Sequence, residues 1–155
     1  MHAATKTNDP LEASIGHATL IQAEAEHIYS LLTTGAGWDA WFTAGARVDA
    51  RPGGDITFRW RNWGPDAVNA DDGGTVMEAQ SPRRLVFQRH PGGPEYATTV
   101  EINLEPRGGG TVVRPWESGY PTTPGGIRAI VECATGWGEA LTLLKFYVEH
   151  GIRMK

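Results

Sequence analysis

A long amphipathic pattern near the C-terminus constrains the fold more than any other feature of the sequence. Within residues 127–150, apolar side chains recur at alternating steps of four and three residues, at Ile130, Ala134, Trp137, Leu141, Leu144 and Val148. This spacing places them in one stripe along an α-helix, which must pack against another layer of the protein. Gly136 and Gly138 interrupt the helix at a cost of about 1 kcal/mol each. We expect them to allow close backbone approach or to leave room for a ligand.

Between residues 46 and 120, the sequence has the alternation and the turn residues of β-strands. Residues 55–63 and residues 98–105 each place apolar side chains on one face and polar side chains on the other. The connections are short and rich in glycine, which predicts an antiparallel sheet. We expect residues 69–74 to form one of the turns. Pro115 lies inside the last strand, where it indicates a bulge or a sheet edge.

Shorter patterns precede this region. A weakly patterned strand over residues 14–21 is followed by helical spacing over residues 23–34 and over residues 37–42. The order predicts an α+β fold, in which a curved antiparallel sheet of about six to seven strands wraps around the long C-terminal helix. Two short helices follow the first strand. We expect residues 1–13 to be a flexible tail and residues 14–155 to form one domain.

Composition and charge exclude several classes of function. There are 14 Lys and Arg residues against 18 Asp and Glu residues, a net charge of −4, which disfavours non-specific binding to nucleic acid. The single cysteine excludes an internal disulfide and suits the reducing cytoplasm. We expect no signal peptide and no membrane span. The five histidines have no metal-ligand spacing, so we predict neither a metal nor a cofactor.

Six tryptophans in 155 residues indicate either an aromatic core or an aromatic-lined cavity. A cavity between the sheet and the C-terminal helix would suit a small hydrophobic molecule. Strand alternation places Trp63 opposite Trp60 and Trp116 opposite Glu117, so we expect Trp63 and Trp116 at the surface or at an interface. The residues predicted to bind the ligand are Trp38, Trp41, Phe42, Phe58, Trp60, Phe87, Ile102, Val113, Glu117, Trp137 and Leu141.

Glu117 is the main candidate for chemistry. Alternation places it on the concave face with Thr111 and Val113, where partial desolvation would raise the pKa of its carboxyl group. It would act either as the polar contact of a ligand or as a general acid or base. The alternative is a structural carboxylate bonded to Tyr, Trp or backbone groups. The sequence has no nucleophile signature, and no catalytic residue other than Glu117 is proposed.

Three further side chains have simpler interpretations. Arg59 and Arg61 share the outer face of their strand, where we expect them to be solvated and paired with Glu101 or Glu105 on neighbouring strands. Cys133 lies on the long helix without a base nearby in sequence. We expect it to be an inert residue of the core or its flank.

Several motifs, taken in order, resemble the START-like helix-grip superfamily. Within it, the chain is similar to bacterial proteins related to the C-terminal domain of the Hsp90 ATPase activator. The resemblance implies a β-α-α-β-β-β-β-β-β-α fold with a deep cavity, and Pro115 departs from its pattern. The motifs cover roughly residues 14–151: Trp-Asp-Ala-Trp-Phe at 38–42, Pro-Gly-Gly at 52–54 ahead of Phe58, residues 73–78 followed by residues 82–87, residues 110–120, and residues 136–150.

The resemblance leaves the function open, since relatives include lipid and hormone carriers, polyketide cyclases, plant allergens and co-chaperone domains. Our first hypothesis is reversible binding of a small hydrophobic or amphipathic ligand in the cavity. The second is an enzyme of the cyclase, dehydratase or hydrolase type that uses Glu117. The third is a co-chaperone-like interaction domain with a docking patch around Trp63 and Trp116, or a homodimer through the same surface.

Overall fold

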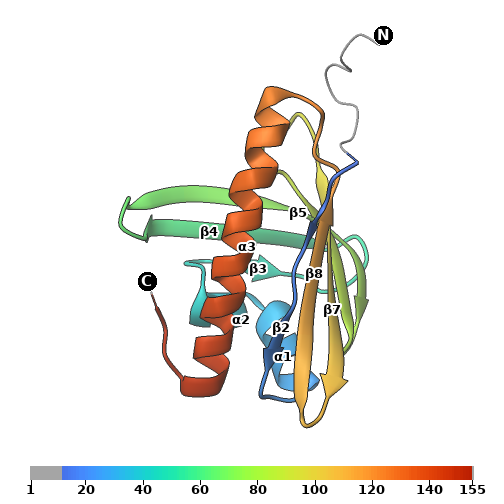
Figure 1. Ribbon diagram of the computed structural model, residues 1–155, viewed down its shortest axis with the longest axis vertical. Helices are drawn as coiled ribbons and strands as arrows, with labels where there is room; N and C mark the ends of the chain where they lie inside the picture. Colours follow the sequence, from blue (N-terminus) through green and yellow to red (C-terminus); the bar gives the residue numbers. More distant parts are fainter. Residues whose placement is uncertain (1–11, 155) are drawn as a thin grey trace.

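The computed structural model describes residues 12–154 as an antiparallel sheet that curves around a long helix (Figure 1). The strand order is β1-β8-β7-β6-β5-β4-β3, and β2 also pairs with β8. This architecture confirms the predicted α+β helix-grip fold, while residues 1–11 of the predicted tail lie outside the described residues. The elements are β1 (Ile15–Gly16), β2 (Thr19–Ile21), α1 (Ala25–Leu32), α2 (Gly35–Trp41), β3 (Arg47–Val48), β4 (Asp55–Trp63), β5 (Val68–Gln80), β6 (Arg84–Arg89), β7 (Thr98–Arg107), β8 (Gly110–Ser118) and α3 (Pro124–His150).

Helix α3 has clear signals at both ends. The Thr123 side chain accepts a hydrogen bond from the backbone N–H of Gly126, and Pro124 occupies the first turn, where its missing N–H costs nothing. At the other end, Gly151 adopts a left-handed conformation with φ 68° and donates its N–H to the Tyr147 carbonyl. The N-terminal cap explains why the helix begins three residues before the predicted residue 127.

Only the C-terminal half of α3 is packed in the core. Leu141 and Leu144 are buried, and the helix contacts β1, β2 and α2. In the N-terminal half, Val131 is 62% exposed, and Ala134, which the apolar stripe placed against the sheet, is also exposed. This half of the helix therefore extends beyond the packed core, and α3 crosses in front of β4 and β5 (Figure 1).

Strand β5 corrects the expectation that residues 69–74 form a turn. These residues pair with β4, and the turn lies at residues 64–67 instead. Gly74 is placed where β5 approaches β6 closely, because a Cβ atom there would lie 2.0 Å from the Gln88 carbonyl oxygen. The glycine-rich sequence is thus required by strand packing, although it has the composition of a turn.

Strand β4 contains a bulge that changes which face its last residue occupies. The register with β5 shifts between Trp60 and Trp63, and Asn62 has a positive φ of 52°. One extra residue reverses the alternation that follows it. Trp63 consequently packs against the core, and its predicted position at the surface is wrong.

Pro115 does not disturb its own strand. The pairing of β8 with β7 is continuous, so the predicted bulge in this strand is wrong, but on its other side β8 has no strand partner at Pro115, as the alternative of a sheet edge predicts. The irregularity falls in the segment that lies beside β8 in the sheet, where β1 and β2 pair with β8 on either side of Pro115. Because proline has no N–H to donate, Pro115 bonds to this segment only through its carbonyl oxygen, which accepts from the His17 N–H at 3.3 Å. The predicted strand over residues 14–21 is therefore divided in two.

We expect Gly74→Ala to lower the free energy of unfolding by about 2 kcal/mol, because the new methyl group would collide with β6. Gly138→Ala is the control, since no atom lies within 4 Å of a Cβ at this helical position. It should raise stability by about 1 kcal/mol. Urea denaturation measures both. A Gly74→Ala protein as stable as the wild type would contradict the close packing of β5 on β6.

Candidate functional site

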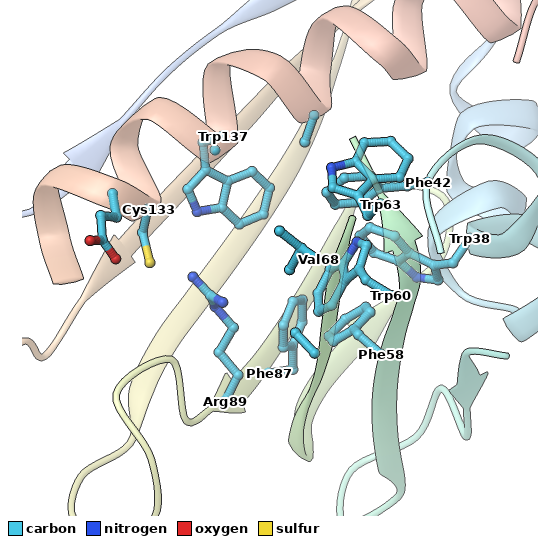
Figure 2. Close-up of a pocket in the computed structure, with 14 residues that line it drawn as sticks. Trp38, Phe42, Phe58, Trp60, Trp63, Val68, Phe87, Arg89, Cys133 and Trp137 are labelled. Carbon is cyan, nitrogen blue, oxygen red and sulfur yellow. The ribbon is translucent and has the colours of Figure 1, made fainter. Parts of the chain in front are cut away.

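A cavity of about 410 Å³ lies between strands β4, β5 and β6 and the N-terminal half of α3 (Figure 2). This volume is within the range of small-molecule sites in proteins. Most of the lining is apolar, and Arg89 and Glu132 are its charged members. The lining residues are Trp38, Phe42, Phe58, Trp60, Trp63, Val68, Ala70, Phe87, Arg89, Glu132, Cys133, Gly136, Trp137 and Ala140.

Five aromatic side chains form one side of the cavity, and we call them the aromatic wall: Trp38, Phe42, Phe58, Trp60 and Trp63. Helix α2 supplies Trp38, Phe42 follows it, and β4 supplies the other three. Phe42 meets Trp60 and Trp63 edge to face, with centroids 5.4 and 5.3 Å apart, and Trp38 meets Phe58 in the same way at 4.8 Å. Such contacts hold each ring in place, so the wall is preformed.

The structure brings only part of the predicted ligand-binding set to the cavity. Trp38, Phe42, Phe58, Trp60, Phe87 and Trp137 line it. Trp41, Ile102, Val113, Glu117 and Leu141 are buried outside the lining. The sequence patterns identified the correct faces of the helices and strands, but they do not indicate how deep along each face the core is filled.

Sequence reasoning missed several lining residues. Trp63 was missed because of the bulge in β4, and Arg89 was missed although it alternates with Phe87 on the same face of β6. A cation in register with apolar residues is a usable signal for a buried ion pair. Cys133 was expected in the core or its flank, and it lines the cavity in a half-buried position. The other missed residues are Val68, Ala70, Glu132 and Ala140, whereas Gly136, one of the two glycines expected to allow close approach or leave room for a ligand, does line the cavity.

Arg89 and Glu117 form a buried ion pair beside the cavity. The Arg89 Nε and Nη2 atoms donate to the two Glu117 carboxylate oxygens, each at 2.8 Å. The Nη1 atom donates to Asp72 Oδ2 at 2.9 Å. The Glu117 side chain has no exposed surface, and that of Arg89 is 16% exposed. Two-pronged geometry of this kind compensates for the cost of burying both charges.

Two further donors complete the surroundings of Glu117. Thr98 Oγ1 donates to Oε2 at 2.6 Å, and Trp137 Nε1 donates to Oε1 at 2.9 Å. With the two bonds from Arg89, every acceptor site of the carboxylate is used. We refer to Arg89, Glu117, Asp72, Thr98 and Trp137 as the Arg89 cluster.

The ion pair reverses the expected pKa of Glu117. Burial acts to raise this pKa, but the bonds and the charge of Arg89, helped by Thr98 and Trp137, outweigh burial and hold the pKa below its usual value. The predicted upward shift is therefore wrong, because it considered desolvation without the cation. The bond to Trp137 agrees with the structural alternative given for this carboxylate.

Two tyrosine hydroxyls lie near the same cluster without a hydrogen-bond partner among the described residues. Tyr120 is fully buried, and its ring centroid lies 6.3 Å from that of Tyr96. Burial raises the pKa of Tyr120, and the Glu117 charge and the Cys133 thiol raise it further. The Tyr120 hydroxyl thus interacts with the Cys133 thiol, and neither Tyr96 nor Tyr120 is among the residues that line the cavity.

The outer face of β4 differs from the prediction in its partners. Arg59 and Arg61 are exposed, as expected, but both pair with Asp71 on β5. Glu101 and Glu105 lie on β7, which is separated from β4 by two strands, so the predicted pairing with them is wrong. None of the three residues of these ion pairs is among those that line the cavity, although each is next in sequence to Trp60 or Ala70, which do.

Within residues 12–154, no three or more His, Cys, Asp or Glu side chains group in a way that could hold a metal ion. The helices of the same residues include none with the length and apolar character needed to cross a bilayer.

The sequence matches a family model over residues 22–149, and that family is described as activator of Hsp90 ATPase homolog 1-like protein. The comparison with curated proteins gives no match. Among solved structures, a similar one is the solution structure of the Aha1 dimer from Colwellia psychrerythraea. It is 26% identical, with a TM-score of 0.73, and the alignment covers 90% of this chain and 98% of that chain.

Two other structures share the fold at lower identity. The AHSA1-like protein from Aeromonas hydrophila is 22% identical with a TM-score of 0.73, over 90% of this chain and 94% of that chain. CalU16 from Micromonospora echinospora is 23% identical with a TM-score of 0.68, over 89% of this chain and 77% of that chain.

We expect the ion pair to make the free energy of unfolding depend on pH in the acid range. Because the pKa of Glu117 is lower in the folded chain than its ordinary value of 4.5, its contribution is fully present above pH 4.5. It is lost as the pH falls through the lower, folded pKa. Urea midpoints between about pH 6 and about pH 2 should therefore fall more steeply for the wild type than for Glu117→Gln. Identical slopes would contradict a paired, ionised Glu117.

Proposed function

The chain belongs to the activator of Hsp90 ATPase homolog 1-like family, and we propose that it binds a small hydrophobic or amphipathic molecule between the sheet and α3. The observation that carries this proposal is the cavity of about 410 Å³ beside the aromatic wall. Apolar surface left in contact with water is unfavourable, and a ligand that covers it releases that cost. Because the wall is preformed, little ordering is needed when the ligand binds.

The N-terminal half of α3 supports the same proposal. Gly136 lines the cavity, and a Cβ atom at this position would have no neighbour within 4 Å. The missing side chain leaves space at the helix surface that faces the aromatic wall. A planar molecule placed there would be buried at about 25 cal/mol per Å² of apolar surface, which suffices for micromolar affinity after the entropy losses.

The enzyme hypothesis has less support. An acid or base needs a lone pair or a proton available to the substrate, whereas Arg89, Thr98 and Trp137 occupy every acceptor site of Glu117. The co-chaperone hypothesis relied on Trp63 and Trp116 at one surface, and Trp63 lines the cavity instead. Both hypotheses stay predictions that no contact in the site favours.

We expect N-phenyl-1-naphthylamine, a neutral apolar dye, to bind saturably with an affinity of about 1–10 µM. Gly136→Leu should weaken it at least about tenfold, because the new side chain would occupy part of the cavity. Gly138→Leu is the matched control, since it makes the same change two residues away outside the lining. Dye fluorescence measures the binding. Either the absence of saturation or equal effects of the two variants would contradict binding in this cavity.

We also propose that the chain forms a homodimer through the outer face of β8. The relative from Colwellia psychrerythraea is described as a dimer. In this chain, Trp116 is 47% exposed, and its ring lies over Gly16, where a Cβ atom would be 2.8 Å away. The indole is thus an exposed apolar surface supported from below, which suits an interface between two copies.

Trp116→Lys should shift the protein from dimer toward monomer, because a charge would replace the apolar contact. Val131→Lys on α3 is the control, since it introduces the same charge at a more exposed apolar position on another element. Light scattering coupled to size-exclusion chromatography measures the mass. A monomeric wild type, or equal dissociation of both variants, would contradict the proposed interface.

A further inference from the structure

The guanidinium of Arg89 retains hydrogen-bonding capacity at the cavity. Three of its five N–H groups donate to Glu117 and Asp72, which leaves two. Arg89 lines the cavity, and Figure 2 shows its side chain extending toward Trp137 and Cys133 on α3. The free N–H groups are therefore donors of a charged group at the edge of an apolar space, where a hydrogen bond is strong.

The two carboxylates that bind Arg89 are already occupied. Glu117 receives four hydrogen bonds, and Asp72 receives three, from Arg89 and from the backbone N–H groups of Gly73 and His90. The two remaining N–H groups of Arg89 are donors, so a ligand group that binds to them must accept hydrogen bonds.

The charge of the same region decides which acceptor fits. Arg89 is a single cation facing the carboxylates of Glu117 and Asp72, and Glu132 adds a third carboxylate to the lining. A ligand carboxylate beside Arg89 would be repelled by these anions in a site with little water. A carbonyl oxygen would gain the charge-assisted hydrogen bond without that repulsion.

From these observations we propose that the cavity selects neutral planar molecules that carry a carbonyl-type acceptor, and that it disfavours their carboxylate analogues. This inference rests on the proposed ligand-binding function. The aromatic wall holds the ring system of the ligand, and the two free N–H groups of Arg89 hold its carbonyl oxygen. The Arg89 cluster therefore acts as a selectivity filter for ligand charge, and Glu117 contributes by neutralising Arg89.

Four probes with the same two fused rings test the inference by isothermal titration calorimetry at pH 7. They are naphthalene, 2-acetylnaphthalene, 2-naphthoate and 2-naphthylmethylammonium. We expect 2-acetylnaphthalene to bind about tenfold more tightly than naphthalene, because it alone adds a neutral acceptor for Arg89. We expect 2-naphthoate to bind at least about tenfold more weakly than 2-acetylnaphthalene. The ammonium probe should also bind more weakly than 2-acetylnaphthalene, because it offers Arg89 no acceptor and the hydrogen bonds in place at Glu117 and Asp72 leave these carboxylates already paired.

A paired substitution tests the role of the cluster. Arg89→Met combined with Glu117→Gln removes both charges of the ion pair while keeping similar side-chain volume, and Asp72, which loses its bond from Arg89, keeps those from the backbone N–H groups of Gly73 and His90. In this protein, 2-acetylnaphthalene and naphthalene should bind with equal affinity, so the ratio of the two affinities within the variant is the quantity to compare with the wild type. Retained preference for 2-acetylnaphthalene would overturn the assignment to Arg89. If this variant does not fold, the four probes on the wild type decide the question alone.

The outcomes separate this inference from the function beneath it. If naphthalene binds but 2-acetylnaphthalene gains nothing, or 2-naphthoate binds as tightly, the selectivity is wrong while ligand binding stands. Tightest binding of the ammonium probe would identify the cavity as a cation site and would likewise overturn the inference. If none of the four probes binds, the proposed ligand-binding function fails together with the selectivity.

Discussion

Glu117 has no contact with water, and its burial as an anion is the condition on which the site depends. The carboxylate lies on β8, its cation Arg89 lies on β6, and a third partner, Trp137, lies on α3. Since an unpaired buried charge would cost several kcal/mol, these three elements are tied together across the sheet. The bond from the indole N–H also fixes how the N-terminal half of α3 stands above the strands.

The cavity under α3 stays open because only the C-terminal half of the helix packs tightly against the rest of the protein. The C-terminal half of the helix is sealed against the sheet through Leu141 and Leu144, whereas the N-terminal half carries exposed residues such as Val131 and glycine at position 136. On the opposite side, edge-to-face contacts hold the aromatic wall in place, so its rings do not collapse into the space. The result is a cavity with a preformed aromatic wall on one side and the Arg89 cluster at its edge.

Family membership alone leaves the function open, because one fold supports many activities. What distinguishes this chain is the chemistry of the Arg89 cluster. The Glu117 carboxylate, which accepts four hydrogen bonds and is held ionised, acts as a structural anion that orients Arg89 at the edge of the cavity. The same contacts that weaken the case for Glu117 as an acid or base therefore strengthen the case for charge-selective binding.

The periodic patterns of the sequence determined the element order, the amphipathic C-terminal helix and the antiparallel sheet, because those patterns depend on neighbours a few residues apart. Contacts between distant residues decided the rest. The bulge at Asn62 placed Trp63 in the cavity, and the close approach of β6 required glycine in β5 where a turn was expected. Arg89 and Glu117 are 28 residues apart, and only the register of β6, β7 and β8 brings them together. Local periodicity can indicate that a charged side chain faces inward, but it does not identify the residue with which that side chain forms an ion pair.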